Sequence, residues 1–115
     1  MLKVLVCGGR SYNDKQCVYD TLSAIHREKG IAVIMHGDAM GADYWAKRWA
    51  HMHASKVKEA AFPADWERHG RAAGPLRNQE MLDAGPDLVV AFPGGVGTAD
   101  MVRRGEKSGV EVRKL

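Results

Sequence analysis

The residues from 87 to 100 read DLVVAFPGGVGTAD, and their types and spacing suit the binding of a phosphate group. An apolar run is followed by a proline, three glycines within four positions and a threonine. Where a strand passes into a helix, backbone N–H groups and the helix dipole favour an anion, and glycines let a ligand approach the backbone. The threonine can cap the helix or donate its hydroxyl to phosphate, whereas an ordinary turn needs fewer glycines. The run predicts a phosphate-binding loop of Pro93, Gly94, Gly95, Gly97 and Thr98.

Two earlier strand-like runs also end in loops that contain glycine. The first is followed by CGGR, in which the glycines permit close approach of a ligand and the arginine offers a bidentate fork for phosphate. The second is followed by HGDAMGAD, whose first aspartate can hydrogen-bond a ribose hydroxyl. The second aspartate of that loop can do the same or can stabilise the first turn of a helix, and both alternatives stay open. The predicted ligand-binding residues here are Gly8, Gly9, Arg10, Gly37, Asp38 and Asp43.

A polar segment from 62 to 81, FPADWERHGRAAGPLRNQEM, contains the other candidates. Arg77 and Asn78 follow a Gly-Pro pair at the expected start of a helix. An arginine there opposes the helix dipole, so a bound anion explains it better than helix stability does, although a surface arginine is the alternative. Trp66 would either stack on a ligand or fill the core, and we expect it in the core. If the protein is an enzyme, the candidate acids are Asp65, Glu67 and Glu80.

These loops belong to a chain in which expected strands and helices alternate. The expected strands span 2–7, 31–35, 57–62, 88–92 and 110–114. The expected helices run from a cap at Asn13 to a stop at Gly30, from the 36–43 loop to about 53, from 76 to 84 and from 98 to 107, with 63–75 irregular. Three strands are near-continuous apolar runs, as parallel strands covered on both faces are. The pattern predicts one α/β domain over 1–115, with a three-layer, Rossmann-like, doubly wound and mainly parallel five-stranded sheet.

The sheet predicts where a ligand would lie. In open α/β sheets, ligands bind beyond the carboxyl ends of the strands, where the strand order reverses. We therefore expect the first and fourth strands to be neighbours, with Gly9, Gly37 and Gly95 on one rim.

Composition narrows the classes of partner. The chain has 115 residues, 45% of them hydrophobic and 27% charged, with a net charge of +3. The basic residues are dispersed, so nucleic acid is not expected as a partner. No apolar run approaches the ~18 residues of a membrane span, and no secretory segment precedes the first strand, so we expect a cytoplasmic protein.

Histidine, cysteine and tryptophan spacing narrows the classes of site. The two cysteines lack metal-site spacing, and His51 and His53 are wrongly spaced to be two ligands on one helical face, so we expect no metal and no cofactor. Trp45 and Trp49 are four residues apart, which indicates a packing stripe or the face of a homodimer.

The motifs CGGR (7–10), HGDAMGAD (36–43), FPADWERHGRAAGPLRNQEM (62–81) and FPGGVGT (92–98) together resemble the YspA-like branch of the SLOG superfamily. This superfamily groups the DNA-processing protein DprA/Smf with the LONELY GUY (LOG) proteins. The resemblance spans nearly the whole chain. It implies a Rossmann-like domain that binds a nucleotide or a nucleotide-derived signal, as a sensor or binding module.

LOG enzymes are phosphoribohydrolases that cut the N-glycosidic bond of cytokinin riboside monophosphates, and their pattern is an arginine followed by PGGxGTxxE. By that resemblance Arg77 takes the place of the arginine, and Met101 takes the place of the catalytic glutamate. Methionine is neither an acid nor a base, so the resemblance implies phosphate binding without LOG-type hydrolysis. The alternatives are an N-glycosidase or phosphoribohydrolase with a relocated acid, and a DprA-like module for single-stranded nucleic acid.

Overall fold

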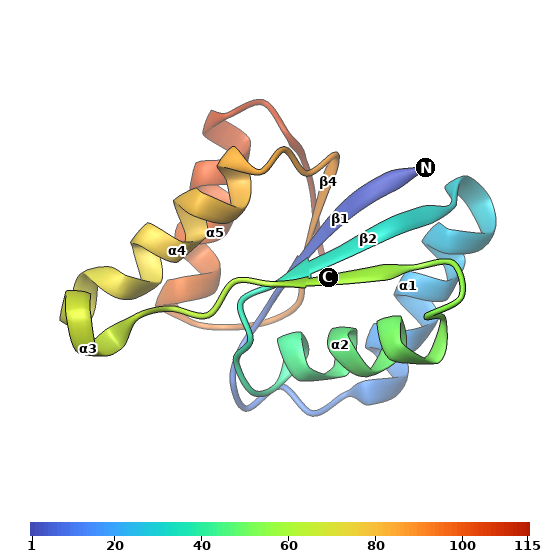
Figure 1. The fold of residues 1–115 in the computed structure, drawn as a ribbon, viewed down its shortest axis with the longest axis horizontal. Helices are drawn as coiled ribbons and strands as arrows, with labels where there is room; N and C mark the ends of the chain where they lie inside the picture. The colour runs from blue at the N-terminus through green and yellow to red at the C-terminus, as the bar shows by residue number, and fades with distance from the viewer.

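Strands and helices alternate along the chain in the computed structural model, which describes all 115 residues (Figure 1). The strands are β1 (Leu2–Cys7), β2 (Ile31–His36), β3 (Lys58–Ala61), β4 (Leu88–Ala91) and β5 (Glu111–Lys114). The helices are α1 (Lys15–Lys29), α2 (Ala42–Met52), α3 (Trp66–His69), α4 (Ala73–Asp83) and α5 (Val96–Lys107), and a 3₁₀ turn, η1 (Gly70–Ala72), joins α3 to α4.

The five strands form one sheet in the order β3-β2-β1-β4-β5, and every neighbouring pair is parallel. The predicted Rossmann-like α/β fold is thereby confirmed, with a sheet that is wholly parallel. The chain moves outward from β1 through β2 to β3, then returns to pair β4 with the other side of β1, so that Cys7 lies beside Ala91. This reversal of strand order places a switch point between β1 and β4.

Two helical layers cover the sheet (Figure 1). Side chains of β1 alternate between its faces, so Val4 and Val6 pack in the cluster with α1 and α2, whereas Leu5 and Cys7 pack in the cluster with α4 and α5. Each fully buried aliphatic side chain contributes roughly 1.5–3 kcal/mol to folding. The two clusters therefore hold α2 and α5, which lie on opposite faces of the sheet, at fixed positions around the switch point.

The tryptophan stripe of α2 is a packing feature. Trp49 is fully buried in the core, and its indole N–H donates a 2.9 Å hydrogen bond to Ser23 Oγ on α1. Trp45 is half-buried and packs against the same cluster. The stripe thus joins α2 to α1 and to the sheet.

Three expected helix starts are wrong, for local reasons. The cap of α1 is Asp14 rather than Asn13, because the Asp14 carboxylate accepts the Cys17 backbone N–H at 3.0 Å. The last helix begins at Val96 with Gly95 as its cap, two residues before the expected start. The stretch expected to be irregular holds α3, η1 and the first residues of α4. Pro75 fits there because the N–H groups of a first helical turn have no partner within the helix.

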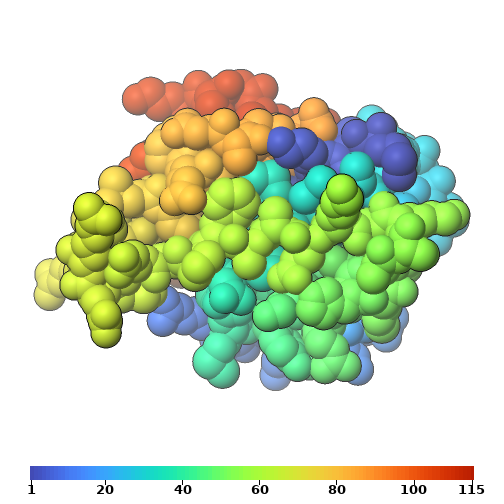
Figure 2. All heavy atoms as spheres, viewed as in Figure 1, coloured from blue at the N-terminus to red at the C-terminus, as the bar shows by residue number.

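The segment that contains α3 lies beyond the carboxyl ends of the strands, on the left in Figure 1. In the space-filling view it stands out from the body of the molecule as a yellow-green projection (Figure 2). None of the helices is both long and apolar enough to cross a membrane.

Candidate functional site

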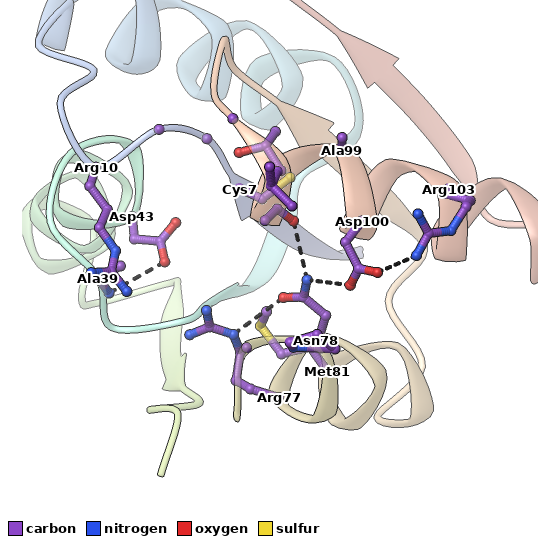
Figure 3. A pocket seen from close by; sticks show the side chains of 18 of the residues that line it. Cys7, Arg10, Ala39, Asp43, Arg77, Asn78, Met81, Ala99, Asp100 and Arg103 are labelled. Carbon is purple, nitrogen blue, oxygen red and sulfur yellow. Dashed lines mark hydrogen bonds and ion pairs between the residues drawn. The ribbon is translucent and has the colours of Figure 1, made fainter. Parts of the chain in front are cut away.

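A cavity of about 700 Å³ lies at the switch point, within the range that small-molecule sites usually have. Its walls come from the loop after β1, from the α3–α4 segment and from the start of α5. Figure 3 shows Arg10 and Asp43 on one side, Asp100 and Arg103 on the opposite side, and Arg77 with Asn78 below them. Nine of the residues that the sequence predicted to bind ligand line this cavity: Gly8, Gly9, Arg10, Asp43, Arg77, Asn78, Gly95, Gly97 and Thr98.

The start of α5 presents free backbone donors to the cavity. No side chain caps this helix, and Gly95, Gly97 and Thr98 are part of the cavity wall. The first N–H groups of a helix have no partner within it, so they are open to an anion. A Cβ atom built on Gly95 or Gly97 would have no atom within 4 Å beyond its chain neighbours and the backbone of its own helix. Packing therefore does not require glycine at these two positions, and its effect is to leave room in front of the N–H groups.

Other glycines allow the backbones of the loops after β1 and β4 to pack closely together. The Gly9 N–H donates to Pro93 O at 2.9 Å, and a Cβ on Gly94 would lie 2.6 Å from the Gly9 nitrogen. A Cβ on Gly8 would lie 2.6 Å from the Cβ of Ala42 on α2. Pro93 and Gly94 do not line the cavity. They hold the two loops against each other and so fix the shape of its wall.

Four arginines line the cavity: Arg10, Arg71, Arg77 and Arg103. Arg103 forms an ion pair with Asp100, whereas the other three form no ion pair with any carboxylate. Arg10 and Arg71 are exposed to water, whereas Arg77 is half-buried, where a charge is costly unless a partner or ligand compensates it. The cavity thus concentrates uncompensated positive charge.

Arg77 shows this imbalance most clearly. Its guanidinium is half-buried and donates from Nη1 to Gly37 O at 2.6 Å and, more weakly, to Phe62 O at 3.4 Å. Its pKa lies below the usual arginine value because of burial, with Arg10 adding repulsion and Asp43 opposing the shift. A side chain on Gly37 would collide with this guanidinium. Glycine at position 37 therefore leaves room for Arg77 to hydrogen-bond the loop after β2. The Nη2 group of Arg77 has no hydrogen bond to the protein.

Asp43 has a structural task at the start of α2. It is 6% exposed, and its Oδ2 atom accepts the backbone N–H groups of Gly37 at 2.9 Å and Ala39 at 3.4 Å. Burial raises its pKa, against the opposing effects of His36, these two N–H groups and Arg77. One carboxylate oxygen is thus used to hold the loop after β2.

Asp38 and Gly37 lie beside a smaller cavity, of about 300 Å³, which adjoins the first and shares Arg10 and Arg77 with it. Asp38 has a left-handed φ of 57° and pairs with Lys47 at 3.6 Å. The Asp38 N–H donates to His36 Nδ1 at 3.0 Å, which holds this strained residue in place.

The position matched to the LOG glutamate lies in the core. Met101 is fully buried between α5 and the sheet, and Asp100 lines the cavity. The Asp100 carboxylate accepts hydrogen bonds from Asn78 Nδ2 at 3.0 Å, from Arg104 at 2.9 Å and from Arg103. Burial raises its pKa, but these three donors outweigh burial and leave the pKa below its usual range. The Asp100 carboxylate is therefore ionised, and its three donors hold it in place.

The candidate acids Asp65, Glu67 and Glu80 line neither cavity, and all three are exposed. Asp65 caps α3 by accepting the Arg68 backbone N–H at 3.1 Å. Cys7 does line the main cavity, but burial raises the pKa of its thiol to about 12. The thiol thus stays protonated at neutral pH and is no nucleophile.

Some residues that line the main cavity were not expected there from the sequence. The expectation that Trp66 fills the core is wrong, because its side chain lines both cavities and is 48% exposed. Arg71 and Arg103 were not singled out, since arginines in polar segments look like solvated surface until their neighbours are known. No group of three or more His, Cys, Asp or Glu side chains is placed to hold a metal ion, and the expected absence of a metal and a cofactor stays a prediction.

Comparison with known proteins agrees with this architecture. The pattern of the YspA, cpYpsA-related SLOG family matches residues 2–69, which include the loops after β1 and β2 and the α3 segment. The chain belongs to this SLOG family. It is also 42% identical over 118 residues to the Gene 61 protein of Mycobacterium phage D29, covering 97% of this chain and 94% of that protein. No solved structure matches the SLOG chain.

Proposed function

We propose that this SLOG protein binds a nucleotide or another ribose-phosphate ligand at the carboxyl ends of β1 and β4, as a binding or sensor module. The observation that carries the proposal is the pairing of an uncapped helix N-terminus with three arginines that have no carboxylate partner, all in one cavity. Both features favour a compact anion such as phosphate. Membership in the SLOG family supports a nucleotide as the source of that phosphate.

The main cavity and the adjoining smaller one offer different groups to such a ligand. We assign the phosphate to the N–H groups of residues 95–98, with Arg77 and Arg10 supplying charge. Asp38 lies in the adjoining cavity with one carboxylate oxygen near Lys47, and its other oxygen is open to a ribose hydroxyl only in a ligand that extends into that cavity. Asp43, whose Oδ2 already accepts two backbone donors, keeps one oxygen for the same purpose.

Calorimetric titration of the whole chain tests the proposal with four probes: adenosine monophosphate, ribose 5-phosphate, adenosine and a single-stranded oligothymidylate. The two monophosphates are expected to bind, with adenosine at least tenfold weaker because it lacks the anion. The oligonucleotide is expected to bind no more tightly than a monophosphate, since the arginines without a carboxylate partner line one cavity of about 700 Å³ and do not extend along a strand-length groove. Equal affinity for adenosine and its monophosphate, or binding of neither, would contradict the proposal.

The variant Gly97→Ala separates an effect on phosphate binding from an effect on stability. The added methyl group contacts nothing outside its own helix, and alanine in the first turn of α5 is expected to leave stability unchanged or raise it by up to about 1 kcal/mol. The same methyl group would crowd an anion at the helix start. We expect the affinity for ribose 5-phosphate to fall at least tenfold while the melting temperature does not fall. Unchanged affinity would place the phosphate elsewhere.

A second candidate function is hydrolysis of the N-glycosidic bond of the bound nucleotide, and the carboxylate of Asp100 in the cavity wall favours it. An ionised carboxylate can stabilise the positive charge that develops on the ribose. Here, however, two arginines and an amide already neutralise and occupy that carboxylate. We therefore expect binding without turnover. Chromatography of adenosine monophosphate incubated with excess protein should show no free adenine, and release that Asp100→Asn abolishes would establish the enzyme instead.

A further inference from the structure

Trp66 is the tryptophan whose ring is open to solvent. It is 48% exposed, whereas Trp49 is fully buried and Trp45 packs half-buried against the core. An indole carries a large apolar surface that is usually covered in folded proteins. Leaving it open at the wall of a cavity creates a flat apolar face suited to a ligand.

The exposed indole lies where the two cavities meet. Trp66, Arg10, Ala39 and Arg77 each line both the 700 Å³ cavity and the 300 Å³ cavity. The N–H groups at the start of α5 line only the larger one. A ligand anchored by phosphate at α5 would therefore reach the indole with its other end.

A cation lies over the same ring. The guanidinium carbon of Arg10 is 5.4 Å from the centre of the Trp66 ring, and Arg10 comes from a distant segment, the loop after β1. Arg10 has no carboxylate partner, so its planar group is free to stack as well as to attract an anion. Arg10 thus covers part of one face of the indole, and the exposed remainder of the ring is left for a ligand.

The indole is supported by its own segment. The Asp65 cap fixes the start of the short helix that carries it, through the 3.1 Å hydrogen bond from the Arg68 N–H. A Cβ on Gly74 would lie 3.3 Å from the far edge of the indole, so a glycine at this position gives the ring room to rest against α4. The ring is held before any ligand arrives, which lowers the entropy cost of stacking.

Resting on the nucleotide binding proposed above, we propose that Trp66 and Arg10 form a stacking subsite for the nucleobase at the join of the two cavities. Stacking uses the π-face that every base possesses and grows with the size of the ring system. The subsite therefore selects purine over pyrimidine nucleotides and discriminates little between adenine and guanine.

The test compares adenosine, guanosine and uridine monophosphates with ribose 5-phosphate, which has no ring. For the unaltered protein, the two purine nucleotides are expected to bind about 10- to 100-fold more tightly than ribose 5-phosphate, with the uridine nucleotide between. Trp66→Ala should bring the purine nucleotides to the level of ribose 5-phosphate and leave ribose 5-phosphate itself unchanged. Trp66→Phe should keep part of the preference. Leu76→Ala removes a similarly exposed apolar side chain that lines neither cavity, and it should change nothing.

Fluorescence supplies a readout that does not depend on the alanine variant folding. Purine nucleotides should quench the emission of the unaltered protein, and Trp66→Phe should abolish that quenching, because Trp45 and Trp49 do not line the cavities. Retained quenching in Trp66→Phe, or unchanged purine affinity in a folded Trp66→Ala, would overturn the stacking subsite and leave nucleotide binding standing. Failure of the unaltered protein to bind any of the four probes would overturn both proposals.

Discussion

At the scale of single residues, Arg77 combines two tasks that its position makes compatible. Its Nη1 group donates to the carbonyl oxygen of Gly37 at the beginning of the loop after β2, and its Nη2 group has no protein partner. Arg77 is the fifth residue of α4 and not at its start as expected, because the helix begins at Ala73; the hydrogen bond to Gly37 accounts for the arginine without an anion. The second task leaves a directed cation in the cavity.

Arg77→Ala is expected to weaken binding of ribose 5-phosphate by roughly 1.5–3 kcal/mol, the usual scale for a hydrogen bond to a charged group. Adenosine should lose much less. Stability should also fall by about 1 kcal/mol, because the carbonyl group of Gly37 loses its donor. Calorimetry and urea unfolding measure the two effects separately, and Arg68→Ala, an exposed arginine outside both cavities, is the control. Equal losses for both ligands would mean that Arg77 does not contact phosphate.

Met101 illustrates how a sequence match and a site can diverge. Restoring the LOG-type acid by Met101→Glu would place a carboxylate at a fully buried position among apolar side chains. We expect this variant to lose about 3 kcal/mol or more of stability and to gain no hydrolytic activity. Thermal unfolding together with the adenine-release assay checks this expectation. A stable, active Met101→Glu protein would mean that this position can turn toward the cavity.

At the scale of elements, α4 and α5 are joined by polar contacts as well as by the core. Asn78 on α4 donates to Gly97 O at 3.2 Å and to Asp100 at 3.0 Å, and Arg104 on α5 donates to Gln79 at 3.0 Å. This link fixes the start of α5 against α4, and so it fixes the direction of the free N–H groups at residues 95–98. The geometry of the candidate site depends on the pair of helices as a unit.

The link predicts a pH dependence. The pKa of Asp100 is lowered in the folded protein, so its stabilising effect is fully present above the ordinary carboxylate pKa near 4 and is lost as the pH falls through the folded value. Asp100→Asn should therefore be less stable by roughly 1.5–3 kcal/mol at pH 7, with the difference shrinking below about pH 4. Urea unfolding between pH 2.5 and 7 measures this, with the exposed Asp83→Asn as the control. A difference independent of pH would contradict the assigned role.

At the scale of the whole molecule, the cavity lies where both halves of the sheet contribute to one wall. The loop after β1, the start of α2 and the start of α5 all meet there, and they belong to both helical layers. A ligand at this place contacts segments distant in the sequence and present together only in the folded chain. Binding of the proposed ligand there would therefore be coupled to global folding.

This coupling predicts stabilisation by mass action. Adenosine monophosphate at about one hundred times its Kd should raise the free energy of unfolding by about 2.7 kcal/mol, and the melting temperature should keep rising with concentration. Adenosine at the same concentrations should have a much smaller effect. Differential scanning calorimetry gives both values. A rise of equal size for adenosine would argue against a phosphate site.

Much of the fold could be predicted because it depends on local patterns. The apolar runs that became β1, β2 and β4 and the helical spacing of Val18, Leu22 and Ile25 are visible without neighbours. The positions of helix starts were less predictable, because Asn13 and Asp14 are both good caps and the choice depends on the path of the chain into α1. The glycine loops of the candidate site are recognisable in the sequence, but their use as a phosphate site stays a prediction.

The sequence by itself determined the alternation of strand and helix, the parallel sheet and the glycine loops after β1, β2 and β4, since these follow from the residues present in each segment. Only the tertiary structure decided that Asp100 faces the cavity and Met101 the core, and that Trp66 and Arg10 meet. Adjacent helical residues point about 100° apart, so the rotation of α5 about its axis, set by packing on the sheet, decides which of them reaches a ligand. Contacts between distant loops depend likewise on strand order, which no short segment specifies.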